Sequence, residues 1–167
     1  MHIARILAIA LAAAAAGATA TTARAADTRL SVSAFGQVSK YSNSDASGNV
    51  YLSVGYLFTD SLEGQVVLNQ TLGGAGEFTL LGLGGKYYFG GVTQAKSWLP
   101  YVHASYLKTL GSGLEFNVAR GGLGMDLPVN EAASITVEAA YVRQETAGVI
   151  KTKTNGSEVL VGLKIRF

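Results

Sequence analysis

The sequence predicts an all-β fold, an eight-stranded antiparallel up-and-down transmembrane β-barrel that follows a cleaved signal peptide. Three observations support this fold class. The chain opens with a short apolar leader. The remainder is dominated by segments in which apolar and polar side chains alternate, separated by Gly, Asn, Asp and Ser clusters. The last of these segments has one wholly apolar face and ends on Phe167.

Residues 1–25 have the pattern of an export signal peptide. A weakly basic start is followed by an apolar run from Ile6 to Ala16, and Ala23-Arg24-Ala25 places small residues where a signal peptidase reads them. The run is shorter than the roughly 20 residues of a spanning helix. The alternative is a buried N-terminal helix, which does not account for the cleavage pattern. We therefore predict cleavage after Ala25 and a barrel domain over residues 26–167.

The charge balance of the mature chain argues against nucleic-acid binding. Of 13 Lys and Arg residues, Arg5 and Arg24 fall in the leader, which leaves eleven cations against eleven Asp and Glu. A concentrated basic patch is needed to hold a phosphate backbone, and the longest here is Lys151-Thr152-Lys153. The chain has no cysteine, so disulfides and cysteine metal sites are excluded.

The final segment shows the alternation most clearly. Successive side chains of a strand point to opposite faces of its sheet. One face is apolar and consists of Val159, Val161, Leu163, Ile165 and Phe167. The other is mostly small or charged and consists of Glu158, Leu160, Gly162, Lys164 and Arg166. A half-buried strand of a soluble lipocalin-like barrel would show the same alternation, so this pattern alone leaves that fold open.

Seven further strands are predicted upstream. They cover residues 29–40, 49–58, 62–72, 78–89, 98–109, 114–127 and 134–145. Most have about ten residues or more, the length that a tilted spanning strand needs. The side chains predicted to face lipid are Leu30, Val32, Ala34, Gly36, Val38, Val50, Leu52, Val54, Tyr56, Phe58, Val66, Leu68, Leu81, Leu83, Tyr87, Phe89, Val102, Ala104, Tyr106, Ile135, Val137, Ala139 and Tyr141.

The sixth segment changes parity. Phe116 and Val118 define one apolar face, whereas Leu123, Met125 and Leu127 define the other. A β-bulge near Ala119 would account for the change. Alternatively, the polar residues at the start of the segment, Glu115 and Asn117, stand above the lipid band.

The connections and aromatic residues fit a barrel that crosses a membrane. Residues 59–61, 90–97 and 128–133 are predicted periplasmic turns, and 41–48, 73–77, 110–113 and 146–156 are predicted outer loops. The aromatic residues near predicted strand ends, expected to form a girdle at the membrane surface, are Tyr56, Tyr87, Phe89, Trp98 and Tyr101.

The mature sequence resembles the small outer-membrane β-barrel superfamily, the group around the outer membrane protein A barrel and the opacity proteins. The likeness is carried by residues 54–63, 83–89, 100–102 and 122–127, and by the terminal strand. It implies a location in the outer membrane of a Gram-negative cell, with the lipid bilayer as the surroundings. It also implies that the barrel-assembly machinery reads Val159, Val161, Leu163, Ile165 and Phe167. Oligomeric state does not follow from it.

Several charged residues are predicted to point inward. The proposed lumen charge network consists of Glu63, Lys86, Arg120, Glu138, Lys164 and Arg166, with Asp126 and Glu158 also on inward positions. An eight-stranded barrel has an interior just wide enough for side chains to fill, and buried charges must be paired. We therefore expect salt bridges that plug the lumen, with Arg120 and Glu138 on neighbouring strands. The alternative is a narrow channel lined by the same charges.

An enzymatic reading rests on His103, the one histidine of the mature chain. His103 and Ser105, with Glu115, superficially resemble the residues of outer-membrane lipid A deacylases. However, the alternation points His103 and Ser105 into the lumen, away from a lipid substrate. We predict no catalytic residues, no cofactor and no metal site. The predicted function is a non-enzymatic structural or surface-interaction barrel, with a small channel or a lipid A-modifying hydrolase as alternatives.

Overall fold

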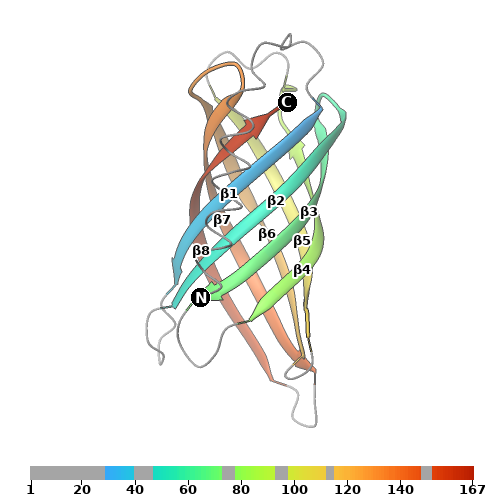
Figure 1. Cartoon of the computed structure of the whole chain (residues 1–167), viewed down its shortest axis with the longest axis vertical. Helices are drawn as coiled ribbons and strands as arrows, with labels where there is room; N and C mark the ends of the chain where they lie inside the picture. The colour runs from blue at the N-terminus through green and yellow to red at the C-terminus, as the bar shows by residue number, and fades with distance from the viewer. Residues whose placement is uncertain (1–28, 40–46, 73–77, 93–97, 112–114, 148–151) are drawn as a thin grey trace.

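The computed structural model describes residues 29–39, 47–72, 78–92, 98–111, 115–147 and 152–167, which form one closed barrel of eight antiparallel strands (Figure 1). The strands are β1 (Leu30–Ser39), β2 (Ser47–Thr59), β3 (Leu62–Leu72), β4 (Thr79–Tyr88), β5 (Leu99–Thr109), β6 (Glu115–Pro128), β7 (Ala133–Ala147) and β8 (Lys153–Arg166). The predicted fold class is confirmed. The predicted signal peptide, residues 1–25, lies outside the described residues and remains a prediction.

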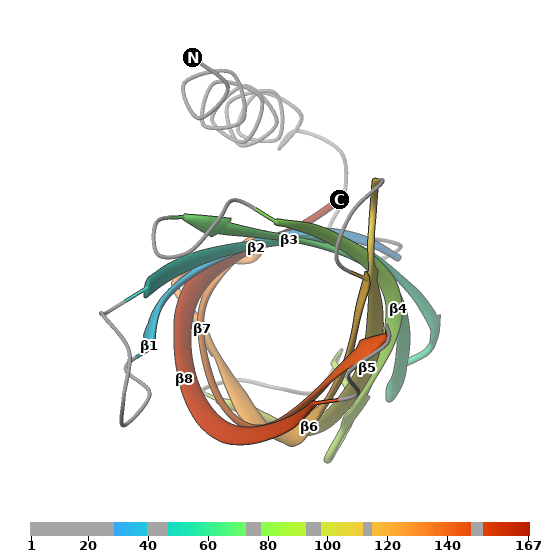
Figure 2. The same ribbon diagram turned by 90° about the horizontal axis from the view of Figure 1, so that it is seen from below.

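Each strand pairs with the next in sequence, and β8 pairs with β1 to close the ring, which Figure 2 shows along the barrel. The closing pairs run from Ser31 with Arg166 to Gly36 with Val161. The first and last strands therefore begin and end at the same end of the barrel, which is the periplasmic end in a barrel with an even number of strands.

The alternation predicted from sequence places the side chains correctly on most strands. No predicted lipid-facing residue with a described side chain is buried, whereas inward positions such as Ser31, Asn69 and Thr136 are fully or almost fully buried. One aromatic residue was assigned wrongly. Tyr101 is only 1% exposed and faces the lumen, because its neighbour Val102 takes the outward position.

The sixth strand contains no bulge near Ala119. β6 pairs with β5 and β7 in an unbroken register through this position. Phe116 and Val118 face the lumen, where Phe116 packs against buried apolar residues, while Glu115 is exposed on the outside. The change of parity arises because the outer end of β6 lies above the lipid band, where outward positions are polar and inward positions are apolar.

β7 and β8 continue beyond their predicted ends at the outer end of the barrel, and β6 accompanies them, since Glu115 pairs with Ala147. Residues 146–156 were predicted as a loop, but β7 reaches Ala147 and β8 starts at Lys153, with Glu145 paired to Lys153. The hydrophobic pattern missed this extension because both of its faces carry polar residues, among them Gln144 and Thr154. Figure 1 shows the two strands projecting past β1 at the outer end of the barrel.

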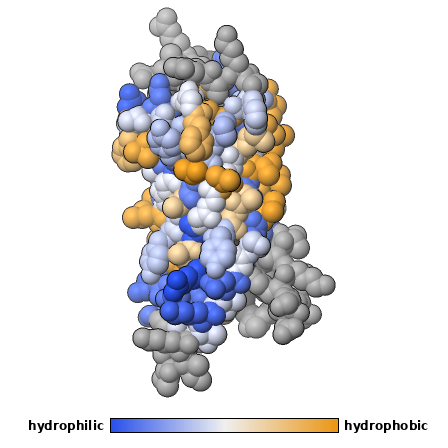
Figure 3. All heavy atoms as spheres, turned by 180° about the vertical axis from the view of Figure 1, so that it is seen from behind, coloured by the Kyte–Doolittle hydropathy of each residue, from blue (hydrophilic) through white to orange (hydrophobic). Residues whose placement is uncertain are grey.

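The exterior of the barrel is apolar where a soluble protein would be polar. Exposed large apolar side chains stand on all eight strands and include Val54, Phe58, Leu83, Leu123, Tyr141 and Val159. In Figure 3 the hydrophobic atoms gather above a hydrophilic lower end. No helix in the described part of the chain is long and apolar enough to cross a membrane. A closed barrel satisfies its backbone polar groups internally, so this exterior suits contact with lipid.

The inside of the barrel holds two apolar clusters. The larger one, here called the apolar cap, fills the outer half of the lumen and consists of Phe35, Tyr51, Val67, Leu80, Leu107, Val118, Val142 and Leu160. The smaller one lies toward the periplasmic end and contains Tyr88, Leu99 and Tyr101. Most charged residues of the lumen lie on the periplasmic side of this cluster, but Glu158 of β8 is nearer the outer end than Leu160, and the Arg120 guanidinium stacks on the Tyr51 ring.

A charge placed in the middle of the lipid-facing belt should destabilise the barrel. Leu83 is 69% exposed and stands between the outward residues Val66 and Tyr106. We expect Leu83→Arg to lower the free energy of unfolding in lipid vesicles by about 2–4 kcal/mol, because lipid cannot solvate the guanidinium. The measurement is reversible denaturant unfolding. Asn117→Arg, on the polar outer end of β6, should cost only about 0–1 kcal/mol, and equal costs at both positions would contradict the membrane placement.

Candidate functional site

The residues of the predicted lumen charge network all occupy inward positions. Glu63 lies on β3, Lys86 on β4, Arg120 on β6, Glu138 on β7, and Lys164 and Arg166 on β8. Five of them are buried, and the Arg166 side chain is only 10% exposed. They divide into two groups, a mid-lumen cluster and a periplasmic cluster.

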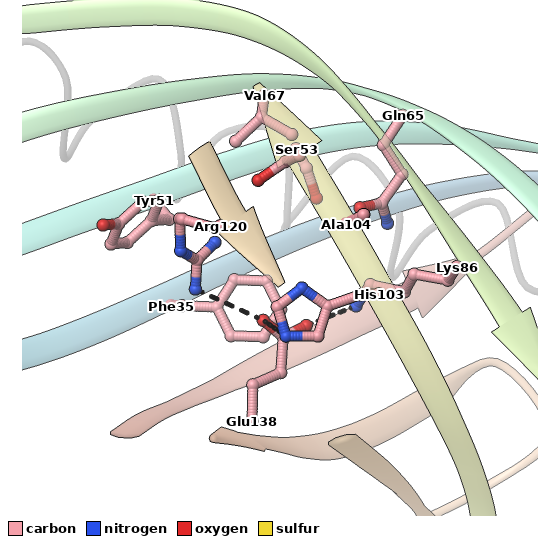
Figure 4. Close-up of a pocket in the computed structure, with 11 residues that line it drawn as sticks. Phe35, Tyr51, Ser53, Gln65, Val67, Lys86, His103, Ala104, Arg120 and Glu138 are labelled. Carbon is pink, nitrogen blue, oxygen red and sulfur yellow. Dashed lines mark hydrogen bonds and ion pairs between the residues drawn. The ribbon is translucent and has the colours of Figure 1, made fainter. Parts of the chain in front are cut away.

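The mid-lumen cluster is centred on Glu138. Lys86 Nζ lies 2.6 Å from Glu138 Oε1, and the Tyr101 hydroxyl donates a hydrogen bond of 2.7 Å to the same oxygen. Lys86 Nζ also donates to the Tyr101 hydroxyl at 3.1 Å, which closes a triangle of polar groups. Figure 4 shows Lys86, Arg120 and His103 directed toward this carboxylate. The carboxylate therefore has its neutralising partner within the barrel interior.

Arg120 joins two carboxylates in this cluster. Its Nε donates a hydrogen bond to Glu158, and its Nη2 lies 3.7 Å from Glu138 Oε2. The guanidinium also stacks at 4.5 Å from the Tyr51 ring centroid, and the Tyr51 hydroxyl donates to Glu158 at 3.3 Å. The closer partner of Arg120 is thus Glu158 rather than the predicted Glu138. Tyr51, a member of the apolar cap, links this ion pair to the cap.

The periplasmic cluster is centred on Lys164, which is fully buried. Lys164 Nζ donates hydrogen bonds to Glu63 and to the Tyr88 hydroxyl, and it lies 3.8 Å from Asp126 Oδ2. The Tyr88 hydroxyl in turn donates to Glu63 at 2.8 Å. Arg166 Nη2 lies 2.7 Å from the same oxygen of Asp126.

Uncharged polar side chains donate further hydrogen bonds to the carboxylates of Glu63 and Asp126. Ser31 and Gln65 donate hydrogen bonds to Glu63 at 3.0 and 2.6 Å, and Thr136 donates to Asp126 at 2.8 Å. Buried carboxylates need such partners on their remaining lone pairs. Strands from opposite parts of the sequence are therefore tied together across the lumen.

The charges of the lumen balance. Among the described residues that face inward, the cations Lys86, Arg120, Lys164 and Arg166 stand with the carboxylates Glu63, Asp126, Glu138 and Glu158. The two clusters meet where the Tyr88 and Tyr101 rings contact edge to face, with centroids 5.2 Å apart. A balanced interior has no net charge that would attract an ion of one sign.

The tyrosines of the site were not recognised from the sequence. Tyr51, Tyr88 and Tyr101 each place a hydroxyl within the charge clusters. The alternation of side chains between the two faces of a strand could have identified them, because each tyrosine stands between two outward residues on its strand. Asp126 and Glu158 were assigned inward positions but were left out of the predicted network.

A small cavity lies beside the mid-lumen cluster (Figure 4). Its volume is about 20 Å³, enough for about one water molecule. Four buried polar atoms without a hydrogen-bond partner among the described residues belong to side chains that line it, namely Ser53 Oγ, His103 Nε2, Ser105 Oγ and Arg120 Nη2. A mixture of donors and acceptors of this kind suits water.

The residues of the hydrolase alternative do not come together. His103 and Ser105 line the lumen cavity, whereas Glu115 is exposed on the outer end of β6. The carboxylate beside His103 is that of Glu138, at 3.8 Å from Nε2. The described part of the chain contains no group of three or more His, Cys, Asp and Glu residues placed to hold a metal ion.

Comparisons with known proteins support the fold. No protein-family model matches the chain, and no curated protein matches it. The N-terminal β-barrel domain of OprF from Pseudomonas aeruginosa is similar, with a TM-score of 0.60, 18% identity, and coverage of 84% of this chain and 98% of that one.

Two other solved structures give the same result. A de novo designed transmembrane β-barrel has a TM-score of 0.59 and 15% identity, over 84% of this chain and 95% of that one. The outer membrane protein OprG from Pseudomonas aeruginosa has a TM-score of 0.54 and 18% identity, over 84% and 96%. At these identities the likeness concerns the fold. Together with the apolar exterior, it gives this chain the fold of a small eight-stranded transmembrane β-barrel.

Proposed function

We propose that the protein is a non-enzymatic outer-membrane barrel with a structural or surface-interaction role and a lumen closed by side chains. The observation that carries this proposal is the pairing of the buried charges. Each described lumen cation lies within 2.7 Å of a carboxylate, and the carboxylates accept further hydrogen bonds from tyrosine, serine, threonine and glutamine. Such a network fills the interior with groups that cannot move independently.

The apolar cap adds a second closure, and the Arg120–Glu158 ion pair lies against its Tyr51 ring. Its eight side chains come from all eight strands, and Leu107 and Leu160 are fully buried within it. An apolar constriction disfavours water and therefore hydrated ions. To cross the barrel, an ion would have to pass both the side chains of the cap and the paired charges.

The two alternative functions, a small channel and a lipid A-modifying hydrolase, each explain fewer features of the lumen. A small channel is favoured by the polar atoms that line the mid-lumen cavity, but this cavity is also bounded by Phe35 and Tyr51 of the apolar cap. A lipid A-modifying hydrolase would need its nucleophile to reach lipid. Ser105 faces a cavity of about 20 Å³ inside the barrel, which is too small for an acyl chain.

The outer face of the terminal strand β8 is suited to recognition by the barrel-assembly machinery. Val159, Val161 and Leu163 are exposed on the outside of β8, on the face that also carries Ile165 and Phe167. We propose that this apolar face is the assembly signal, as the family resemblance implies. It is continuous and accessible to another protein before lipid covers it.

Conductance in a planar bilayer separates the closed barrel from the channel. We expect no unitary conductance steps from the purified protein. Arg120→Ala/Glu138→Ala should remain closed, because the apolar cap is intact. Adding Leu107→Ala and Leu160→Ala should open an ohmic pathway, since both closures are then thinned.

Heat-modifiability on a gel checks that each of these variants still forms a closed barrel. If the unmodified protein conducts, and Arg120→Ala or Glu138→Ala alone changes its conductance, the channel is correct and the closed lumen is wrong.

The charge clusters should also contribute strongly to stability. Glu138→Leu leaves Lys86 buried without its carboxylate, so we expect the free energy of unfolding to fall by about 3–5 kcal/mol. Adding Lys86→Met should recover much of this loss, because the uncompensated charge is removed with its partner. Denaturant unfolding in lipid vesicles measures both variants.

The exposed carboxylate of Glu145, which pairs with Arg143 on the barrel exterior, provides the matched control. Glu145→Gln should cost no more than about 1 kcal/mol. A loss for Glu138→Leu that is equally small would show that the lumen network does not hold the barrel together.

A further inference from the structure

The outer wall of β7 and β8 carries a groove of about 320 Å³. It is lined by Ala139, Ala140, Tyr141, Ser157, Glu158 and Val159, all from these two strands, so it lies on the wall of the barrel and not in the lumen. Ala140 and Glu158 point inward and contribute their main chain. The groove exists because the small residues Ala139 and Ser157 stand between the exposed side chains of Tyr141 and Val159.

Cationic side chains stand directly above this groove. In the register of β7 with β8, Tyr141 pairs with Ser157, the next outward pair is Arg143 with Asn155, and the one after is Glu145 with Lys153. Two residues of a strand span about 7 Å, so Arg143 lies one such step beyond Tyr141 on the same face. The side chains of Arg143 and Lys153 are 50% and 63% exposed.

These cations are not fully neutralised by their neighbours. Arg143 Nε and Nη2 both lie near Glu145 Oε1, at 2.9 and 2.6 Å, and Lys153 Nζ lies 3.6 Å from the same oxygen. Two cations thus share one carboxylate. Lys108 of β5 is also exposed in this row of outward residues, in register with Asn117 and through it with Glu145. The group retains a net positive charge and donors that suit a phosphate.

The groove and the cations together match an amphiphile. The groove lies at the upper edge of the apolar belt, and the cations lie where the polar outer end of the barrel begins. A soluble phosphate would contact only the cations, whereas a membrane lipid would use both. We propose that this surface is a binding site for a membrane lipid with a phosphate headgroup, with an acyl chain in the groove and the phosphate on Arg143 and Lys153.

The test compares two lipids that differ only in headgroup. Dioleoyl phosphatidic acid and dioleoyl phosphatidylcholine are titrated onto the full-length barrel in a neutral detergent, and bound lipid is counted by native mass spectrometry. We expect phosphatidic acid to bind more tightly. Arg143→Gln/Lys153→Gln should weaken its binding about thirtyfold, from about fivefold per cation near a membrane surface. Millimolar inorganic phosphate should not displace it.

A groove variant and a charge control complete the experiment. Ala139→Leu fills the groove without changing charge and should weaken both lipids at least threefold. Arg29→Gln removes an exposed cation next to the start of β1, at the opposite end of the barrel, and should change nothing. Equal binding of the two lipids, a preference that survives Arg143→Gln/Lys153→Gln, or unchanged affinity in Ala139→Leu would each overturn the proposal.

Discussion

The pairing of buried charges inside the barrel is the constraint on which the rest of this structure depends. A membrane barrel turns its apolar side chains outward, so its polar side chains must share a narrow interior. There Lys164, Glu63 and Asp126 satisfy one another at the periplasmic end, as Lys86, Arg120, Glu138 and Glu158 do in the middle. A shift of one residue in β3, β4, β6, β7 or β8, the strands that carry these charges, would turn a charge toward lipid and leave its partner unpaired. The network therefore selects the register as well as filling the lumen.

The lumen is organised in layers along the axis. The cluster around Lys164 occupies the periplasmic part, whereas the Arg120–Glu158 ion pair lies against residues of the apolar cap toward the outer end. Tyrosines join the layers, since Tyr51 packs in the cap while bonding Glu158, and the Tyr88 and Tyr101 rings meet between the two charge clusters. Tyrosine suits these boundaries because its ring packs against apolar groups and its hydroxyl reaches a charge. This layering favours a closed barrel over a uniformly polar channel.

Parity along each strand could be predicted from sequence, because lipid demands apolar residues at every second position. Contacts across the lumen could not, since they depend on the stagger between strands that closes the barrel. Arg120 and Glu138 are on adjacent strands, yet the register places Arg120 opposite Val142 and brings Glu158 closer. The outer ends of β6, β7 and β8 were also misjudged. Beyond the lipid band, outward positions are no longer required to be apolar. Phe116 therefore faces the lumen, and the strands continue through polar residues.

The loss of that rule is itself informative about function. Inside the belt, lipid dictates which residues can stand on the exterior, and those residues carry little specific information. Beyond the apolar belt, β7 and β8 carry Arg143, Glu145 and Lys153 on their outer face. Contact with lipid does not explain why these charged residues are there. Exposed ion pairs add little to stability, so their placement is poorly explained by folding alone. The projecting ends of these strands are therefore the part of the described exterior best suited to contact other molecules, whereas the buried charges of the lumen have their partners within the barrel.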